Sequence, residues 1–219
     1  MYLSRFDMFL KNKKLKSQKI KYNNPTKMNG FYYYPDRVQN AQELIRRIDE
    51  MKWLDEYSGD RRYQHYGHTF NYYISGGPTP MPDFLAPLIE QMEGMCKLAL
   101  MSYDYDGSAP YFNQCTVNEL LPGQGVEPHT DSYGYGDLIA TVTLGAGVTT
   151  IFRIKEESDQ DQAQDQEEYT FYAQPNSVYY MEGDARWNAT HEVPGATEDT
   201  DDGTIIPRGR QIVLVFRHV

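Results

Sequence analysis

The segment PGQGVEPHTDSYGYGD, residues 122–137, contains the most informative spacing in this chain, His129-Thr-Asp131. In an extended strand, residues i and i+2 point to the same face, so this imidazole and this carboxylate can reach one metal ion. A third ligand has to come from a distant strand, and His191 in NATHEVPG, residues 188–195, is suitably placed. Two histidines and one carboxylate that leave three positions open form the ligand set typical of non-haem iron(II) oxygenases. The sequence therefore predicts an iron(II) site on His129, Asp131 and His191.

The surroundings of this motif favour a metal site over a polar surface turn. A Pro-Gly turn precedes it, a strand-like run of Val, Ile and Thr follows it, and His191 comes 60 residues after Asp131. Zinc is the other metal to weigh. A mixed nitrogen and oxygen set with no thiolate beside it does not favour a structural zinc site.

Short segments rich in Val, Ile, Thr and Tyr follow one another in the second half of the chain, separated by Gly, Pro and Asn. They are residues 111–121, 138–144, 149–154, 169–173, 177–181 and 211–216. Several short strands at this spacing predict a sandwich or barrel. The first half instead predicts two helices, one opened by a capping box of Asn40 and Glu43 and one over residues 82–101 with Pro82 in its first turn. The predicted fold class is mainly β with N-terminal helices, an α+β jelly roll.

Length and composition favour one soluble intracellular domain. The chain has 219 residues and two cysteines, which are too few for a disulfide framework and fit a reducing compartment. It contains no run of roughly 18 apolar residues, which a membrane span needs, and no secretory signal. We expect no membrane span, and we favour the cytoplasm or nucleus over mitochondria.

The net charge of −10 is unevenly distributed and divides the chain into two parts. Residues 1–27 form a basic arm, and residues 28–219 form the predicted domain. The arm is either a solvated tail, a nucleic-acid arm, a docking arm for an acidic partner or a targeting segment, although it has few of the Arg and Ser residues that targeting segments use. Residues 155–168, KEESDQDQAQDQEE, predict a solvated acidic loop that is a second candidate surface for protein partners.

Four segments in order resemble the AlkB family of iron(II)- and 2-oxoglutarate-dependent dioxygenases, most closely its tRNA wobble-uridine hydroxylase branch. They are RRYQHYGHTF at residues 61–70, the segment from Asn118 to Asp131, residues 183–193 and residues 208–219. The resemblance covers nearly everything beyond the basic arm. It implies a double-stranded β-helix, iron on the three predicted ligands, and contacts from Asn118 and Arg217 to the C1 end of 2-oxoglutarate.

The resemblance also implies that residues 61–70 belong to a lid over a target nucleotide. Aromatic rings and guanidinium planes are suited to hold a base taken out of its stack. Tyr63, His65 and Tyr66 are the stacking candidates, and Arg61 or Arg62 is suited to meet a phosphate. The alternative is that Tyr66 belongs to the core and the arginines are solvated.

The chain departs from the family pattern at two positions that normally serve the far carboxylate of 2-oxoglutarate. Leu120 stands where the family usually has tyrosine, and Gln211 stands where it usually has arginine. A buried carboxylate needs a cation and hydrogen bonds. Strand alternation places Gln211 on the face of Arg217 and Arg210 on the other face, so a β-bulge is needed to turn Arg210 inward. Arg208 is the other candidate for that role.

Two functions follow from these observations. The first is an oxygenase that hydroxylates or demethylates a modified nucleobase, in RNA rather than DNA. The acidic balance argues against tight unassisted nucleic-acid binding, which leaves a protein substrate open. The second is an AlkB-fold subunit without turnover that has a structural or assembly role in a larger complex. An arginine that points into the pocket favours the enzyme, and its absence favours the subunit.

Overall fold

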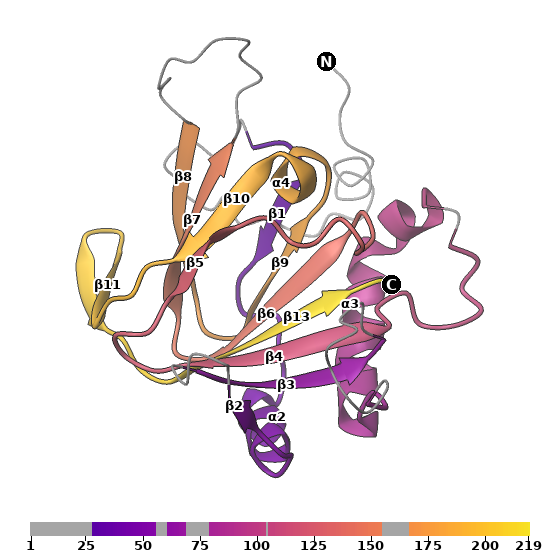
Figure 1. Cartoon of the computed structure of the whole chain (residues 1–219), viewed down its shortest axis with the longest axis horizontal. Coiled ribbons are helices and arrows are strands. Elements are labelled where there is room, and N and C mark those ends of the chain that lie inside the picture. Colours follow the sequence, from indigo (N-terminus) through magenta and orange to yellow (C-terminus); the bar gives the residue numbers. More distant parts are fainter. Residues whose placement is uncertain (1–27, 56–60, 69–78, 104, 155–166) are drawn as a thin grey trace.

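Two antiparallel sheets form the body of the protein, whose computed structural model describes residues 28–55, 61–68, 79–103, 105–154 and 167–219. The larger sheet has the order β1-β9-β6-β13-β4-β3-β2 and the smaller has the order β5-β10-β7-β8, with β11 and β12 as a separate ribbon (Figure 1). The strands of the larger sheet are β1 (Phe31–Tyr34), β2 (Leu54–Asp55), β3 (Arg62–Gly67), β4 (Gln114–Leu120), β6 (Ile139–Gly145), β9 (Ser177–Met181) and β13 (Gln211–Arg217). The remaining strands are β5 (Val126–His129), β7 (Val148–Ile154), β8 (Glu167–Ala173), β10 (Ala189–Val193), β11 (Glu198–Asp201) and β12 (Thr204–Pro207).

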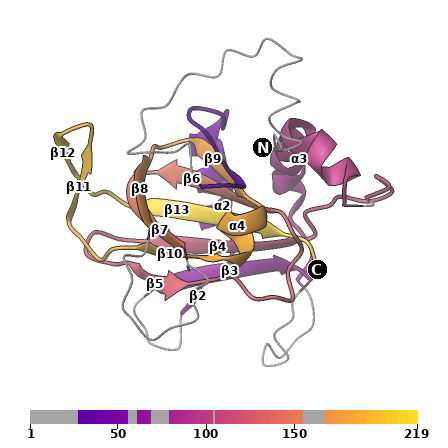
Figure 2. The same cartoon turned by 90° about the horizontal axis from the view of Figure 1, so that it is seen from above.

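The two sheets pack face to face around an apolar layer that both supply (Figure 2). Phe31 of β1 in the larger sheet contacts Phe152 of β7 and Phe171 of β8 in the smaller sheet, with ring centroids 5.1 and 5.0 Å apart. We call the sides that face each other across this layer the inner faces. This two-layer antiparallel arrangement is the jelly roll that the sequence predicts.

Helices α2 (Ala41–Asp49) and α3 (Ala86–Met101), with the short η1 (Asp83–Leu85) before α3, cover the outer face of the larger sheet. The short α4 (Gly183–Trp187) instead packs against β7 and β10 of the smaller sheet, and its Ala185 is buried in the layer between the sheets. Ile48 of α2 and Met92 of α3 are buried in one cluster with Val117 of β4 and Leu214 of β13. Because side chains alternate along a strand, the residues before and after Leu214 face inward, where the functional site lies.

The six strands predicted in the second half are all present within one to three residues, and both helices form. Two details differ. Asn40 has a left-handed backbone with φ 56° and makes no capping bond from its side chain, while Glu43 pairs with Arg46. The predicted capping box is therefore wrong. The segment from Pro82 begins as a 3-10 turn before α3, and α3 itself kinks at Cys96.

The first half also contributes strands that the sequence did not predict. β1 lies beside β9, and β3 lies beside β4, so the larger sheet is completed at both edges from the N-terminal side. Among the described residues, no helix is long and apolar enough to cross a bilayer. The basic arm, residues 1–27, and residues 155–166 of the acidic loop lie outside the described residues.

Candidate metal and cosubstrate site

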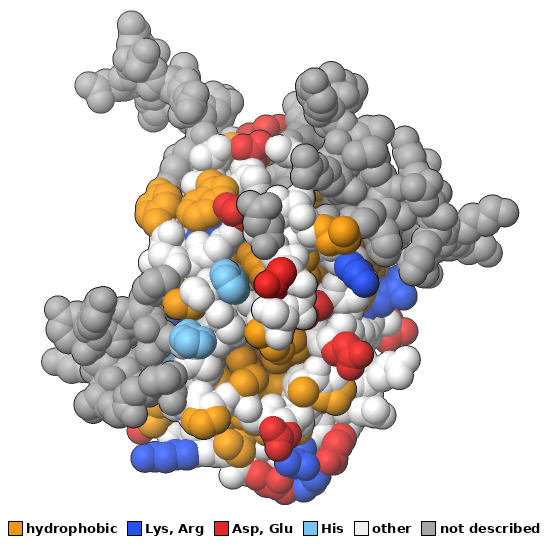
Figure 3. Space-filling view, turned by 90° about the vertical axis from the view of Figure 1, so that its right-hand side faces the viewer, with side chains coloured by type: hydrophobic (Ala, Val, Ile, Leu, Met, Phe, Trp, Pro, Cys, Tyr) orange, Lys and Arg blue, Asp and Glu red, His pale blue; other side chains and the backbone are white. Residues whose placement is uncertain are grey.

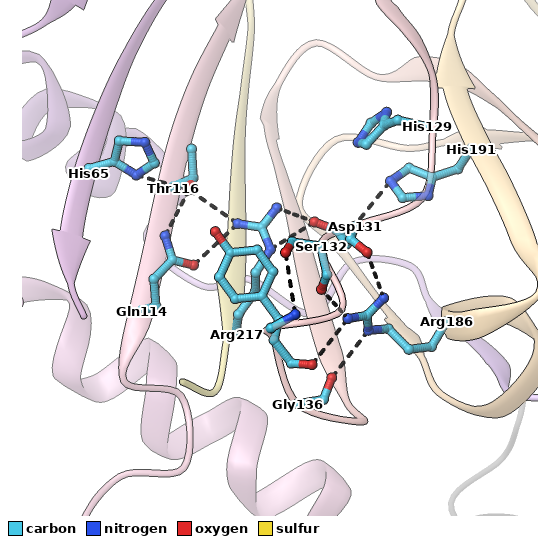
Figure 4. Close-up of polar contacts among 12 residues, drawn as sticks. His65, Gln114, Thr116, His129, Asp131, Ser132, Gly136, Arg186, His191 and Arg217 are labelled. Atoms are coloured by element: carbon cyan, nitrogen blue, oxygen red, sulfur yellow. Dashed lines mark hydrogen bonds and ion pairs between the residues drawn. The ribbon is translucent and has the colours of Figure 1, made fainter. Parts of the chain in front are cut away.

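Three predicted metal ligands meet on the inner face of the smaller sheet (Figure 4). His129 ends β5 and pairs directly with His191 of β10, and the two ring centroids are 4.3 Å apart. Asp131 follows two residues after His129, and its Oδ2 lies 3.6 Å from Nε2 of His191. One ligand atom from each residue lies within 4.8 Å of the other two. Strand pairing thus brings together two histidines that are 62 residues apart in the sequence.

The unsatisfied atoms of these ligands fit a divalent metal ion. Oδ2 of Asp131 is buried and has no hydrogen-bond partner among the described residues. Nδ1 of His129 lies 2.8 Å from the carbonyl oxygen of Glu127, which leaves Nε2 available as a ligand. Burial lowers the pKa of His191 to about 4, so its imidazole is neutral and keeps a lone pair for coordination. Two imidazoles and one carboxylate are therefore ready to hold iron(II).

Arg217 orients the carboxylate of this set. Its Nε and Nη2 donate to Oδ1 of Asp131 at 2.9 and 2.6 Å, and the guanidinium lies over the ring of Tyr135. Burial by itself raises the pKa of Asp131, but the positive charge of Arg217 and its hydrogen bonds outweigh burial and hold the pKa below its usual range. The carboxylate is therefore ionised, with Oδ1 held by the arginine and Oδ2 left for the metal.

Two residues of β4 extend this network toward β3. Nη1 of Arg217 donates to Oε1 of Gln114 at 3.2 Å and to Oγ1 of Thr116 at 3.1 Å. Thr116 in turn lies 3.2 Å from Nδ1 of His65 (Figure 4). The sequence analysis did not select Gln114 or Thr116. The sequence could have identified both residues, because they lie four and two residues before Asn118 on the same strand and therefore point to the same inner face.

Arg186 holds the loop that carries Asp131, and it was also missed as a site residue. It is 1% exposed, and its guanidinium donates to four backbone carbonyls. The acceptors are the oxygens of Asp131, Ser132, Tyr135 and Gly136. Arg186 lies in one of the segments that resemble AlkB proteins, but no sequence pattern tells that an arginine bonds to main chain. The guanidinium of Arg186 thus holds the loop between β5 and β6 against α4.

The arginines proposed to replace the missing cosubstrate cation are both engaged elsewhere. Arg210 faces the helices, where it bonds to Asp49 at 2.6 and 2.9 Å and to Glu119 at 2.6 Å. β13 pairs in regular register with both neighbours from Gln211 onward, so no bulge turns Arg210 inward and that prediction is wrong. Arg208 is buried against Asp199 with two bonds of 2.6 and 2.8 Å, which also contradicts its predicted role.

The other cosubstrate candidates lie where the sequence analysis expected them. Asn118 is on the inner face, paired with Val213 of β13 on one side and Tyr63 of β3 on the other. Arg217 is on the same face at the end of β13. Polar side chains of the two candidate residues thus share the inner face with the partners of the metal ligands. At the other end of β13, beside Gln211 and Leu120, the two candidate arginines Arg208 and Arg210 are both paired with carboxylates.

The predicted lid residues divide between the two faces of β3. Tyr63 and His65 pair with Asn118 and Thr116 and so share the inner face, with ring centroids 5.2 Å apart. Tyr66 is buried in the core beneath the helices, and Arg62 bonds to Glu119 on that outer side. The lid prediction is therefore wrong for these two residues. Arg61 is half-buried just before β3, and Phe70 lies outside the described residues.

A separate groove of 1310 Å³ lies on the side of the molecule that carries α3 and the C-terminus (Figure 3). None of the metal ligands lines it. The charged residues along its described walls are acidic, and they are Asp83, Glu90, Glu93, Asp106 and Asp137. Such a surface repels phosphates, so a nucleic-acid backbone does not fit this groove.

Comparison with known proteins identifies several that are similar to this chain in sequence. The protein is 30% identical to uncharacterized protein L905 of Acanthamoeba polyphaga mimivirus over 93% of this chain and 91% of that one. It is 26% identical to the alkylated DNA repair protein ALKBH8 homolog of Arabidopsis thaliana over 87% of this chain, and the match spans 58% of that protein. It is 25% identical to the probable RNA/DNA demethylase ALKBH6 of Danio rerio over 86% of this chain and 85% of that one.

The fold and the family agree with these relatives. The structure of OsALKBH1 superimposes with a TM-score of 0.60 at 13% identity, covering 86% of this chain and 98% of that one. A sequence profile of the 2OG-Fe(II) oxygenase superfamily matches residues 9–217. This chain belongs to the 2OG-Fe(II) oxygenase superfamily and is an AlkB-like member of it.

Proposed function

We propose that this oxygenase binds iron(II) and a 2-oxo acid and hydroxylates or demethylates a modified nucleobase, in RNA rather than DNA. The observation that carries the substrate class is the pair of rings, Tyr63 and His65, on the inner face of β3. His65 is joined to Arg217 through Thr116, and Arg217 holds the metal ligand Asp131. An aromatic platform linked to a metal site in this way is suited to a flipped base.

Each part of the chain has a definite task in this proposal. His129, Asp131 and His191 would hold the iron, and Asn118 and Arg217 would contact the near end of the cosubstrate. Bound there, iron and a 2-oxo acid would supply oxygen-atom transfer, in which one atom of dioxygen would go to the acid as it loses carbon dioxide and the other to a C–H bond of the substrate. The protein itself would hold the carboxylate of Asp131 through Arg217 and would present the base on Tyr63 and His65.

The electrostatics of the platform support stacking with a base. Burial lowers the pKa of His65, and the positive charge of Arg217 lowers it further. The imidazole is therefore neutral at pH 7, with Nδ1 beside Oγ1 of Thr116 at 3.2 Å. The names of the Arabidopsis and Danio relatives refer to alkylated DNA and to RNA or DNA demethylation, which supports a nucleobase substrate. The similarity of four segments to the wobble-uridine branch favours RNA.

Binding of short oligonucleotides tests the platform. We expect Tyr63→Ala to weaken binding of a single-stranded RNA with a modified uridine by about 10-fold, because one stacking contact is worth ~1–3 kcal/mol. Tyr66→Phe is the matched control, since Tyr66 lies on the same strand but faces the core. Equal binding by the two variants would remove Tyr63 from the substrate site, and tighter binding of DNA would remove the RNA preference.

A second function, a structural or assembly subunit without turnover, is favoured by the pairing of Arg208 and Arg210 with carboxylates. An anaerobic titration with iron(II) and then 2-oxo acids separates the two functions. Chelation of iron by a 2-oxo acid gives a visible charge-transfer band, which we expect for the oxygenase and which His129→Ala should abolish. Iron binding with no band for any 2-oxo acid would favour the subunit.

A further inference from the structure

Gln211 is a buried amide whose two polar atoms have no partner in the described structure. It opens β13 on the inner face, opposite Leu120 of β4 and Gly145 of β6. The residue is 1% exposed, and neither Oε1 nor Nε2 makes a hydrogen bond with a described residue. Leaving a buried amide unpaired destabilises a folded protein, and native proteins contain few such groups. An unpaired donor and acceptor on one side chain therefore point to a ligand that supplies both partners.

Gln211 lies on the inner face of the larger sheet, at the end of β13 that is farthest from Arg217. Arg217, which holds the metal ligand, lies six residues later on the same strand and the same face. Asn118, Val213 and Thr143 form the next cross-strand row toward the metal. A molecule that chelates the metal and runs along this inner face reaches the amide of Gln211 last.

The described residues around Gln211 are uncharged or already paired. Leu120 and Thr143 are each 1% exposed and carry no charge. Arg208 is neutralised by Asp199, and Arg210 lies on the opposite face with Asp49 and Glu119. A carboxylate placed beside Gln211 would lose its water without gaining a cation, which is strongly unfavourable. The far end of this pocket does not fit a dianionic cosubstrate.

We infer that the pocket selects a 2-oxo acid whose far end is an uncharged group able both to donate and to accept hydrogen bonds, such as a carboxamide. This inference rests on the proposed function and narrows its cosubstrate. A carboxamide facing Gln211 accepts from Nε2 and donates to Oε1, so both unpaired atoms are satisfied. A carboxylate only accepts hydrogen bonds, so it leaves Oε1 unpaired and adds a buried charge.

Anaerobic titration of the iron-loaded protein tests this selection without turnover. The probes are 2-oxoglutarate and its 5-carboxamide, counted as the open-chain form, and the readout is the charge-transfer band. We expect the carboxamide to bind at least 10-fold more tightly than 2-oxoglutarate. Gln211→Arg should reverse the order, because the new cation pairs with the far carboxylate.

Two further variants keep the test decisive. Gln211→Leu has a similar volume and should lower carboxamide affinity at least 10-fold, even if the arginine variant does not fold. Arg210→Gln is the control on the other face, and both affinities should stay within about twofold. If the wild type binds 2-oxoglutarate as tightly as the carboxamide, the inference is overturned while the oxygenase function stands. If iron binds but neither acid gives a band, the proposed function itself fails.

Discussion

Arg217 at the end of β13 donates two hydrogen bonds to one oxygen of Asp131, and the other oxygen of that carboxylate lies 3.6 Å from His191. The last strand of the larger sheet therefore sets the direction of a ligand that belongs to a loop beside the smaller sheet. Such partners of metal ligands fix ligand orientation and tune affinity.

Replacement of Arg217 by lysine should weaken iron binding. A lysine cannot place two parallel N–H groups on one carboxylate and also reach Gln114 and Thr116. We expect Arg217→Lys to lower iron(II) affinity by about 10–100-fold, the range found for partners of metal ligands, in an anaerobic competition titration. Arg153→Lys is the control, because Arg153 pairs with Glu168 and Glu192 on the face of the smaller sheet opposite to His191. If Arg217→Lys and the wild type bind iron(II) with equal affinity, the guanidinium of Arg217 does not orient Asp131.

Loss of a metal ligand should have different effects on stability at Asp131 and at His129. Both Asp131→Ala and His129→Ala should abolish iron binding. In the metal-free protein, however, Asp131→Ala leaves the buried Arg217 without its counter-charge, which costs about 3–5 kcal/mol. We expect its Tm to fall by roughly 6–20 °C, since 1 kcal/mol shifts Tm by about 2–4 °C at this size.

His129→Ala should change the metal-free Tm by only a few degrees, because His129 is half-buried and its contacts are one local hydrogen bond and the ring of His191. Calorimetry of both variants without metal gives the comparison. Similar Tm values for the two would contradict the role assigned to the Arg217–Asp131 pair. Retained iron binding in either variant would contradict the ligand set.

Removal of the Arg186 guanidinium should loosen the loop that follows Asp131. Arg186→Met leaves four carbonyl oxygens without their donor, and each buried unpaired group costs about 1–3 kcal/mol. Hydrogen exchange should become faster across residues 132–136, and iron affinity should fall with it. Arg62→Met is the control, since Glu119 keeps its bond to Arg210. If hydrogen exchange across residues 132–136 is unchanged in Arg186→Met, Arg186 does not hold this loop in place.

The Asp199–Arg208 pair should make stability depend on acid pH. Burial raises the pKa of Asp199, but hydrogen bonds from Arg208 and Thr149 outweigh it and hold the pKa below its usual range. A depressed pKa stabilises the folded state above the unfolded-state pKa of about 3.9, and this contribution is lost as pH falls below that value. Asp199→Asn should therefore be less stable than wild type by a constant amount between about pH 5 and 7.

That stability difference should shrink below about pH 4, as measured by urea unfolding across the pH range. Glu198→Gln serves as the control, because Glu198 is exposed and neighbours Asp199 on β11. Its difference from wild type should stay small at every pH. A gap for Asp199→Asn that does not close in acid would show that the pair is not ionised in the folded protein. Arg208 would then again be a candidate cation for the far carboxylate of 2-oxoglutarate.

The period-two spacing of His129 and Asp131 predicted two of the candidate metal ligands, and the runs of β-branched residues predicted six strands in the second half of the chain. These are local properties, because alternation and propensity act over a few residues. Alternation also placed Arg210 on the face opposite Gln211, but the bulge proposed to turn it inward is absent, because β13 keeps an unbroken register with β4 and β6 and Arg210 pairs with Asp49 and Glu119. The assignment of Tyr66 to the lid failed, because Tyr66 shares its strand with Tyr63 but faces the helices.

The sequence by itself therefore determined the jelly-roll class, the three candidate metal ligands and the unusual residues Leu120 and Gln211. Only the tertiary structure decided that no arginine replaces the missing cation and that the amide of Gln211 is buried without a partner. The physical reason is that burial, ion pairing and hydrogen-bond satisfaction depend on which distant segments pack together. A strand pattern determines the face to which a side chain points, but not which groups of distant segments pack against that face.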